Sequence, residues 1–369
     1  MHASYFVRNA SALASPALLV YPEKIRKNSA MAVAIAGSPD RLWPHVKTHK
    51  TARIVAIQQE AGIRKFKCAT VAEAEMLAGC GVEEILLAYQ PVGPAIPRLV
   101  QLCRRYPGVS LKLIVDDRRI ATELSEAFAQ AGLQVEVLLD IDPGMGRTGV
   151  PPDEKAAEFY LELGKLEGIV PGGFHCFDGH NTQEDPDQRM AAARECLAAL
   201  DRLQGWVERK GGRVPRRVLG GTSTFPCYAK LEDVELSPGT CFLQDWNNLR
   251  RYRDIPFQPA ALLLSRVVSK PASGRVTVDT GSKAIAADPP AERGVVFSAE
   301  GFKPLFQSEE HWVFEAQDAQ RFQVGEELYI LPTHICPTFA LHQSVSVVDA
   351  SGQWVDSWPV TSRDRKLTI

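Results

Sequence analysis

The chain has 369 residues, of which 45% are hydrophobic and 23% are charged, and this composition excludes a disordered or fibrous protein. Its formal net charge of -2 gives no electrostatic reason to expect nucleic acid or an anionic membrane as a partner. The length suits one large domain and one smaller domain. We therefore expect a globular protein that binds a small molecule.

The N-terminal segment "MHASYFVRNASALASPALLVYPEK" contains a short apolar stretch that a proline interrupts, with no basic segment before it. This pattern predicts neither a signal peptide nor a membrane span, so we expect a cytoplasmic protein. The eight cysteines include no CxxC pair, which argues against a disulfide framework or a structural zinc ribbon.

Short apolar or β-branched segments alternate with longer amphipathic ones from about residue 40 to residue 245. The predicted strands are "WPHVK", "FKCAT", "EILLAY", "LKLIVD", "VEVLLDID", "GGFHCF", "RRVLGG" and "DVELS". The predicted helices lie at 52–61, 71–78, 94–105, 118–131, 152–166 and 183–210, with a short one after Thr222. This alternation favours a (β/α)8 barrel over a doubly wound sheet, for which no GxGxxG motif is found.

After residue 245 the pattern changes to short strands separated by Gly, Pro, Asn and Asp. Examples are "ALLLSRVVSK", "GRVTVDTGS", "GVVFSAE", "HWVFEA" and "EELYILP". We therefore predict a barrel domain at 16–245 and a mostly antiparallel β domain at 246–369, joined by about residues 1–15.

The first predicted strand belongs to the stretch "RLWPHVKTHKTARI", in which His45, Lys47 and His49 occupy every second position. On a strand these three side chains share one face. One interpretation is a polar edge strand at the surface. The other is a lysine in a polar site, where desolvation or a cationic neighbour lowers its pKa and makes the amine nucleophilic.

Two loops follow the seventh and eighth strands, where barrel enzymes commonly bind phosphate. The first contains Gly221, Thr222 and Ser223, and the second contains Gly239 and Thr240. Glycines permit close backbone approach and hydroxyls donate to phosphate, although both residue types are also common in ordinary turns. The two loops together predict a phosphorylated cofactor, and an inward lysine suggests pyridoxal phosphate, which forms a Schiff base with lysine.

Four further side chains are candidates for chemistry. Arg147 follows the fifth strand and suits a phenolate oxygen or a carboxylate, or else a surface salt bridge. His175 lies on the sixth strand, which should border the ring, although a single histidine is more often structural. His334 and Cys336 lie on one side of a predicted extended segment and suit zinc or another borderline divalent ion, although two ligands alone are a weak signal.

At this point the sequence resembles the alanine-racemase-like type III pyridoxal phosphate enzymes, and among them the D-threonine aldolases and D-serine dehydratases. The resemblance covers nearly the whole chain and rests on "PHVKTHK", "DIDPGMGRTG", "ELSPGTCFLQD", "DTGSKAIAAD", "EEH" and "PTHICPTFALH". It implies that Lys47 holds the cofactor between His45 and His49, and that Arg147 faces the phenolate. It also implies phosphate binding by Gly221, Thr222, Gly239 and Thr240, and metal binding by His334 and Cys336.

At three positions this sequence carries a different residue from the aldolases that it resembles. Those enzymes usually carry aspartate where Cys336 stands, whereas the D-serine dehydratases carry cysteine and use zinc; the following "PTFALH" is similar to the aldolases. Cys241 replaces a frequent tyrosine, and Phe177 stands where several aldolases carry another tyrosine.

The resemblance implies a lyase that uses pyridoxal phosphate and a divalent metal, zinc or manganese, on D-3-hydroxyamino acids. We expect retro-aldol cleavage of D-threonine-like substrates, with Lys47, His49 and His175 as catalytic residues. The alternative is dehydration of D-serine or D-3-hydroxyaspartate; racemisation and cofactor binding without turnover remain further alternatives. We expect a homodimer whose partners do not include nucleic acid or membranes.

Overall fold

The computed structural model describes residues 3–231, 233–290 and 292–369. Backbone contacts divide the chain into two compact units. The barrel unit consists of Ala32–Lys47, Gln58–Gly239 and Asp364–Ile369, and the β unit consists of the residues up to Met31, Thr48–Ile57 and Thr240–Arg363. The predicted domains are each nearly contiguous, whereas both units are assembled from several segments of the chain.

The barrel unit contains seven parallel strands in sequence order, as the alternation of apolar and amphipathic segments predicts. They are β2 (Lys65–Cys68), β3 (Glu84–Leu87), β4 (Ser110–Val115), β5 (Val135–Ile141), β6 (Ile169–Cys176), β7 (Arg217–Leu219) and β8 (Glu235–Leu236). The segment before Lys47 takes the eighth place, because Leu42 bridges Leu236 and His45 bridges Lys67, both in parallel. The predicted barrel architecture is therefore confirmed.

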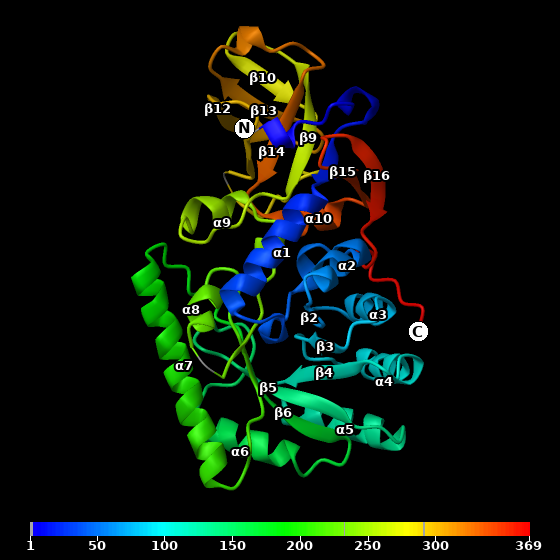
Figure 1. Ribbon diagram of the computed structural model, residues 1–369, viewed down its shortest axis with the longest axis vertical. Helices are drawn as coiled ribbons and strands as arrows, with labels where there is room; N and C mark the ends of the chain where they lie inside the picture. The colour runs from blue at the N-terminus through cyan, green and yellow to red at the C-terminus, as the bar shows by residue number, and fades with distance from the viewer. Residues whose placement is uncertain (1–2, 232, 291) are drawn as a thin grey trace. The chain divides into compact units, whose positions relative to one another are not determined.

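The helices at 71–79, 95–105, 118–130, 154–163 and 186–209 agree closely with the predicted ones and lie on the outer side of the strands (Figure 1), whereas the helices at Pro22–Ala36 and Trp246–Arg251 were not predicted. Helix α5, for example, buries Ile120, Leu124 and Phe128, which share one face through 3.6-residue periodicity. The helices are α1 (Pro22–Ala36), α2 (Ala52–Glu60), α3 (Val71–Gly79), α4 (Ala95–Arg105), α5 (Arg118–Gln130), α6 (Glu154–Leu163), α7 (Pro186–Arg209), α8 (Phe225–Ala229) and α9 (Trp246–Arg251).

The prediction of a strand that continues through Lys47 is wrong beyond His45. The backbone N–H of His45 still donates to the carbonyl of Pro238 at 2.8 Å, but Val46–Thr48 then forms one turn of 3₁₀ helix. Val46 and Thr48 are buried and Lys47 is exposed. Strand alternation therefore does not set the direction of Lys47; a turn at the end of the strand does.

The β unit contains a nine-stranded sheet in which the main strand order is β12-β13-β10-β9-β1-β15-β16, with β14 pairing β9 and β11 pairing β14. Among the described residues, its strands pair antiparallel except β1 with β15, which confirms the mostly antiparallel prediction. Its strands are β1 (Ala17–Val20), β9 (Ala261–Ser269), β10 (Arg275–Val278), β11 (Gly294–Val296), β12 (Phe302–Gln307), β13 (Trp312–Ala316), β14 (Glu327–Pro332), β15 (Ser344–Val348) and β16 (Trp354–Pro359).

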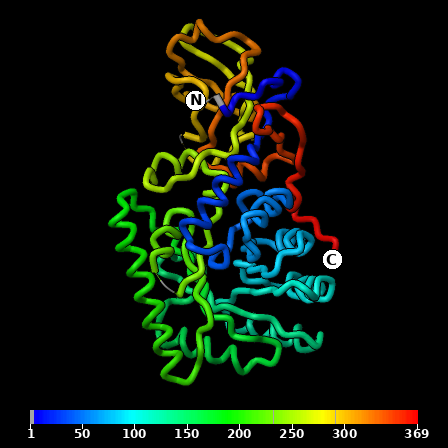
Figure 2. Tube along the Cα trace, viewed as in Figure 1, coloured from blue at the N-terminus to red at the C-terminus, as the bar shows by residue number. Residues whose placement is uncertain are grey.

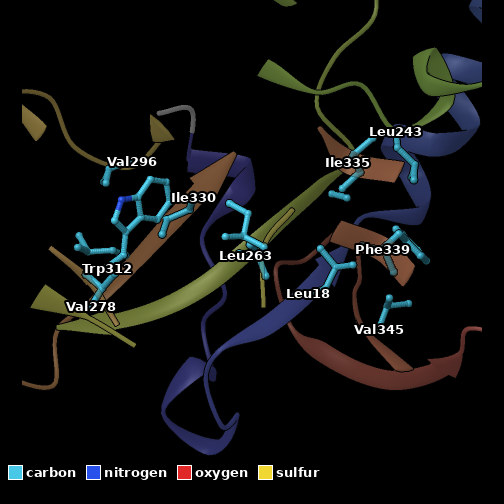
Figure 3. Close-up of a cluster of buried hydrophobic side chains, with 14 of the residues drawn as sticks. Leu18, Leu243, Leu263, Val278, Val296, Trp312, Ile330, Ile335, Phe339 and Val345 are labelled. Atoms are coloured by element: carbon cyan, nitrogen blue, oxygen red, sulfur yellow. The ribbon is translucent and has the colours of Figure 1, made fainter. Parts of the chain in front are cut away.

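The core of the β unit forms where one face of this sheet packs against a short helix, α10 (Ile335–Leu341). Figure 3 shows Leu18 and Leu263 from neighbouring strands together with Ile335 and Phe339 from α10. These side chains are at most 1% exposed. The packing of Ile335 and Phe339 thus anchors the segment that carries His334 and Cys336.

The end of the chain returns to the barrel unit. The backbone N–H of Thr368 donates to Oε2 of Glu75 at 3.0 Å, and Figure 2 shows the red end of the trace beside the helices that contain residues 71–79 and 95–105. Within the described part of the chain, no helix combines the length and the apolar character that a membrane span needs.

Candidate active site

A cavity of about 480 Å³ lies in the barrel unit at the carboxyl ends of its strands. Its lining comes from strand ends and the loops after them, and includes Lys47, Lys67, Arg147, His175 and Phe177. The size is that of a typical small-molecule site, and the place is where barrel enzymes carry their active sites. The structure therefore brings together three predicted site residues, Lys47, Arg147 and His175.

Phe177 lies among three cations in this cavity. The Nζ atoms of Lys47 and Lys67 are 5.7 and 5.5 Å from the centre of its ring, and the guanidinium carbon of Arg147 is 5.0 Å away. Among the residues that the structure describes, no side chain forms an ion pair with Lys47 or Arg147. This cluster of cations without carboxylate partners suits an anionic ligand that carries an aromatic ring.

Arg147 is positioned by the loop that follows β5. One carboxylate oxygen of Asp142 accepts the backbone N–H groups of Gly144, Met145 and Gly146 at 2.9, 2.7 and 3.1 Å, which folds the loop tightly. Gly149 closes it at a φ of +97°, where an added Cβ would lie 2.6 Å from the backbone nitrogen of Asp142. The glycines of "DPGMGRTG" therefore serve the loop conformation that presents Arg147.

His175 occupies the floor of the cavity and is 4% exposed. Its Nδ1 lies 2.7 Å from Oδ1 of Asp140, and its Nε2 lies 3.2 Å from Nζ of Lys67. Burial lowers the pKa of His175 and the neighbouring Lys67 lowers it further, while the bond to Asp140 opposes both effects. The ring is therefore neutral, with its proton on Nδ1 facing Asp140 and the lone pair of Nε2 facing Lys67.

Lys67 is the site residue that the sequence analysis did not single out. It lies on β2, is 2% exposed, and donates to Oγ of Ser237 at 2.8 Å. Burial, followed by the charge of Lys47, lowers the pKa of Lys67 to about 7. The signal was present in "FKCAT", where a lysine stands between two apolar residues of a buried parallel strand and must face the barrel interior.

The first predicted phosphate loop, residues 221–224, is held by a buried carboxylate. Asp178 is 1% exposed and accepts from the hydroxyls of Thr224 at 2.8 Å and Tyr228 at 2.9 Å. Burial raises the pKa of Asp178, and these donors oppose the increase. The hydroxyl of Thr224 also accepts the backbone N–H of Gly221 at 3.1 Å, so this network fixes the conformation of the loop.

The two predicted phosphate loops meet. The backbone N–H of Gly239 donates to the hydroxyl of Thr222 at 3.4 Å. A Cβ at Gly221 would lie 3.0 Å from the ring of Phe177, so the missing side chain keeps the loop next to the cavity lining. The hydroxyl of Ser223 instead donates to the carbonyl of Asn181 at 3.4 Å.

The other two histidines of the "PHVKTHK" segment are buried. His45 lines the cavity, and burial, followed by the charge of Lys47, lowers its pKa well below the ordinary value. His49 is 1% exposed, and its Nδ1 accepts the backbone N–H of Thr51 at 3.2 Å. A catalytic role for His49 stays a prediction.

His334 and Cys336 lie at the start of α10, and the prediction that they share an extended segment is wrong. His334 has extended backbone angles, but Cys336 belongs to the first turn of the helix, because Oδ2 of the buried Asp245 accepts the N–H of Ile335. Nδ1 of His334 lies 2.5 Å from Oδ2 of Asp288. Burial disfavours the charge of His334, but its hydrogen bonds to Cys336 and Asp288 raise its pKa to about 9.

Cys336 has two hydroxyl neighbours in the β unit. Its Sγ lies 3.4 Å from Oγ1 of Thr48, the residue that follows Lys47, and 3.6 Å from Oγ1 of Thr240. Among residues 3–231, 233–290 and 292–369, no three or more His, Cys, Asp or Glu side chains surround one metal position. The pair therefore offers a thiol and an imidazole, with a carboxylate to orient the imidazole.

The residues present fit both predicted cofactors. The cavity offers pyridoxal phosphate an amine at Lys47 and a guanidinium at Arg147 for its phenolate, and the loop at Gly221, where a Cβ would meet the ring of Phe177, lies next to the cavity lining. For a divalent metal, His334 and Cys336 are donors of the types that zinc prefers, and Asp288 on the opposite ring nitrogen is the usual support of a histidine ligand.

Comparison with known proteins gives two family matches along the chain. Residues 20–243 match the family described as alanine racemase, N-terminal domain, and residues 260–348 match the putative serine dehydratase domain. The first match alone spans more than half of the chain.

Among curated proteins, the D-threonine aldolase of Arthrobacter sp is 29% identical over 333 residues, which cover 87% of this chain and 85% of that one. The D-threo-3-hydroxyaspartate dehydratase of Delftia sp. (strain HT23) is 28% identical over 377 residues, covering 94% and 97%.

Solved structures of the same two kinds of protein also match this chain. The crystal structure of D-threonine aldolase from Filomicrobium marinum matches with a TM-score of 0.88 at 28% identity, over 96% of this chain and 97% of that chain. Two variants of D-threo-3-hydroxyaspartate dehydratase match at 0.83 and 26% identity, over 95% or 94% of this chain and 97% of theirs. One replaces a histidine with alanine, and the other replaces a cysteine two positions later and is in the metal-free form.

Proposed function

Because this chain belongs to the alanine-racemase-like family of type III pyridoxal phosphate enzymes, we propose that it is a lyase acting on D-3-hydroxyamino acids. The reaction that we propose is retro-aldol cleavage: the bond between Cα and Cβ breaks, the β-hydroxyl loses its proton, and Cα gains one. A D-threonine-like substrate then gives glycine and an aldehyde. Its relatives include proteins named D-threonine aldolase and 3-hydroxy-D-aspartate aldolase.

The observation that carries this proposal is the unpaired amine of Lys47 in a cavity with Arg147, His175 and Phe177. Lys47 would hold the cofactor covalently, and Arg147 would bind its phenolate oxygen through a charge-assisted hydrogen bond. When bound, pyridoxal phosphate withdraws electrons from Cα of the substrate. His175 borders the ring and, being neutral, does not repel a cation in the same cavity.

The phosphate would be bound by Gly221, Thr222 and Ser223 together with Gly239 and Thr240. The hydrogen bond between Gly239 and Thr222 supports this assignment, because it joins the two loops on the cavity side of the barrel. Asp178 supports it indirectly by fixing Thr224 and so the backbone of Gly221.

We propose that His334 and Cys336 bind a divalent metal, zinc or manganese. A metal with open positions acts as a Lewis acid on a hydroxyl oxygen. The spacing of two residues is the same as that of the histidine and cysteine replaced in the dehydratase variants, one of which is metal-free. Within this chain, Asp288 would keep the proton of His334 on Nδ1 and direct Nε2 to the metal.

The second candidate is dehydration of D-serine or D-3-hydroxyaspartate, and Cys336 favours it, since the resembling D-serine dehydratases carry cysteine at this position. Lys47 would take the proton from Cα, and the β-hydroxyl would leave as water. From D-serine, the remaining enamine hydrolyses to pyruvate and ammonia.

Incubation of the purified protein with pyridoxal phosphate and manganese or zinc separates the two candidates. D-threonine should give acetaldehyde and glycine if the enzyme is an aldolase, whereas D-serine should give pyruvate and ammonia if it is a dehydratase. If neither substrate nor D-3-hydroxyaspartate turns over, and the α-proton of D-alanine exchanges instead, the enzyme is a racemase.

We also propose a cytoplasmic homodimer. Light scattering on the purified protein measures the mass directly, and a value of one chain would contradict the dimer.

A further inference from the structure

The segment 142–150, which carries Arg147, forms a loop whose hydrogen bonds are almost all internal. Two backbone hydrogen bonds of 2.9 Å close its base beside the end of β5, and the carboxylate of Asp142 binds N–H groups inside the loop. Among the hydrogen bonds of the described residues, one joins this loop to the end of another strand: the N–H of Gly149 donates to Oδ2 of Asp116 at 2.9 Å. Asp116 is therefore the outside anchor of the loop.

Asp116 is itself held by a rigid backbone. It is the first residue after β4, is partly buried, and lines the cavity. Oε1 of Gln90, from the loop after β3, accepts the N–H of Asp116 at 2.8 Å and that of Asp117 at 3.1 Å. Asp117 in turn caps α5, because its Oδ1 accepts the N–H of Ile120 at 3.0 Å. The position of the Asp116 carboxylate is thus fixed from two sides.

The guanidinium of Arg147 depends on this support. In the part of the chain that the structure describes, it forms no hydrogen bond or ion pair with another protein group, and its one ring contact is with Phe177, 5.0 Å from the guanidinium carbon. No side-chain partner therefore directs it, so the backbone of the loop must. Gly149, two residues later, is the point where that backbone is tied to the neighbouring strand end.

The hydrogen bonds form one chain across three neighbouring strands, β3, β4 and β5. It runs from Gln90 through Asp116 to Gly149 and so to Arg147. The proposed function, on which this inference rests, gives Arg147 the phenolate oxygen of pyridoxal phosphate. A charge-assisted hydrogen bond of this kind needs a donor that is already in place, because a displacement of a few tenths of an ångström weakens it.

We propose that Asp116 and Gln90 are positioning residues for Arg147. Asp116 holds the backbone of Gly149, and Gln90 holds the backbone of Asp116, so the guanidinium stands at the phenolate position before the cofactor arrives. This role requires an acceptor oxygen at residue 116 and does not require a negative charge. A direct contact of Asp116 with the cofactor, or an effect of its charge on the cavity, gives different results in the following tests.

The first test compares two substitutions of Asp116 in the full-length protein. Asp116→Leu removes the acceptor, whereas Asp116→Asn keeps a carbonyl oxygen and removes the charge. Asp116→Leu should weaken the binding of pyridoxal phosphate about tenfold, part of the loss expected for one charge-assisted hydrogen bond, and Asp116→Asn should stay within about twofold of the unaltered protein. Equal losses in the two variants, or no loss in Asp116→Leu, overturn the proposal.

A double-mutant cycle shows whether Asp116 acts through Arg147. In an Arg147→Met background the guanidinium is absent, so Asp116→Leu should weaken cofactor binding by less than about twofold. A contact made by Asp116 itself would remain in that background. Losses that simply add in the double variant therefore overturn the positioning role.

Hydrogen exchange reports on the loop without any cofactor. The N–H of Gly149 is protected by its bond to Asp116, so Asp116→Leu should speed its exchange about tenfold in the cofactor-free protein, while Asp116→Asn should not. If circular dichroism shows that Asp116→Leu does not fold, Gln90→Met takes its place, because methionine has a similar length and no acceptor oxygen. Unchanged exchange at Gly149 and unchanged cofactor affinity in that variant overturn the proposal.

Asp153→Leu is the matched control. Oδ1 of Asp153 also accepts one backbone N–H at 2.9 Å, that of Ala156 at the start of α6, but Asp153 does not line the cavity. This variant should unfold at a lower urea concentration, because a helix cap is lost, and should bind the cofactor as the unaltered protein does. An equal loss of cofactor affinity in Asp153→Leu would assign the effect of Asp116 to general destabilisation and overturn the proposal.

These outcomes are distinct from failure of the proposed function. If the unaltered protein binds no pyridoxal phosphate, as judged by absorbance after gel filtration, the proposed function fails and this inference fails with it. If the cofactor binds and Asp116→Leu leaves its affinity unchanged, only the positioning role of Asp116 is refuted.

Discussion

Thr224→Val tests whether the buried Asp178 fixes the loop at 221–224. The side chain of Thr224 is fully buried, donates to Asp178 at 2.8 Å and accepts the N–H of Gly221 at 3.1 Å. Valine has nearly the same shape, so the substitution removes both hydrogen bonds without opening a cavity. It leaves a buried carboxylate short of one donor and a backbone N–H without its acceptor.

The expected loss of stability follows from these two bonds. A hydrogen bond to a charged group contributes about 1.5–3 kcal/mol, and a neutral one contributes about 1 kcal/mol. Burial already raises the pKa of Asp178, and loss of the Thr224 donor raises it further, so protonation of the carboxyl limits the cost. We expect the free energy of unfolding to fall by about 2–4 kcal/mol.

Urea unfolding followed by circular dichroism measures this change, and Thr122→Val is the matched control. Thr122 is exposed on α5 and its hydroxyl donates only to the carbonyl of Arg118, so its replacement should change stability by less than about 0.5 kcal/mol. Because Thr224 orients Gly221, the affinity for pyridoxal phosphate should also fall. Equal stability of the two valine variants, with unchanged cofactor affinity, would refute the role of Asp178.

Four other predictions concern the amine, the metal, the buried charge and the core. Lys47→Ala should abolish the borohydride-stable link to pyridoxal phosphate, measured by intact mass, whereas Lys50→Ala should retain it; a link that survives Lys47→Ala contradicts the assignment. EDTA and His334→Ala should each stop turnover while circular dichroism stays unchanged, and full activity without metal would favour racemisation. Burial, followed by Lys47, lowers the pKa of Lys67 from 10.5 to about 7, so the folded cofactor-free protein releases this proton at a lower pH than the unfolded chain does. Its free energy of unfolding should therefore rise by about 2 kcal/mol from about pH 7 to about pH 9 relative to Lys67→Met, and parallel pH curves would contradict this. Leu263→Ala should cost about 2–5 kcal/mol in urea unfolding, since Leu263 is fully buried, and a loss below about 1 kcal/mol would mean that the core collapses around it.

The sequence by itself determined the order and type of most elements. Strand and helix periodicities are local properties, so the seven strands β2 to β8 and the helices after them were predictable from windows of ten to twenty residues. The same reasoning located Lys47, Arg147 and the two glycine-containing loops, because each follows directly after a strand and barrel strands all end at one rim.

Some local conformations were decided by tertiary contacts. Val46–Thr48 forms a 3₁₀ turn although its residue pattern alternates like a strand, because strand pairing ends at the bridge between His45 and Lys67. Cys336 lies in a helix rather than an extended segment, because Asp245, 90 residues earlier in the chain, accepts the N–H at the start of that helix. Ala17–Val20 joins the sheet of the β unit by pairing with β9 and β15.

The cavity floor is the clearest case of what only the tertiary structure decided. Lys67 meets His175, 108 residues away, and Ser237, 170 residues away, because closure of the barrel brings β2, β6 and the end of β8 to one interior. Residue spacing carries no trace of these contacts. The lowered pKa of Lys67 has the same origin, because burial removes water from its amine and Lys47 supplies a second charge nearby.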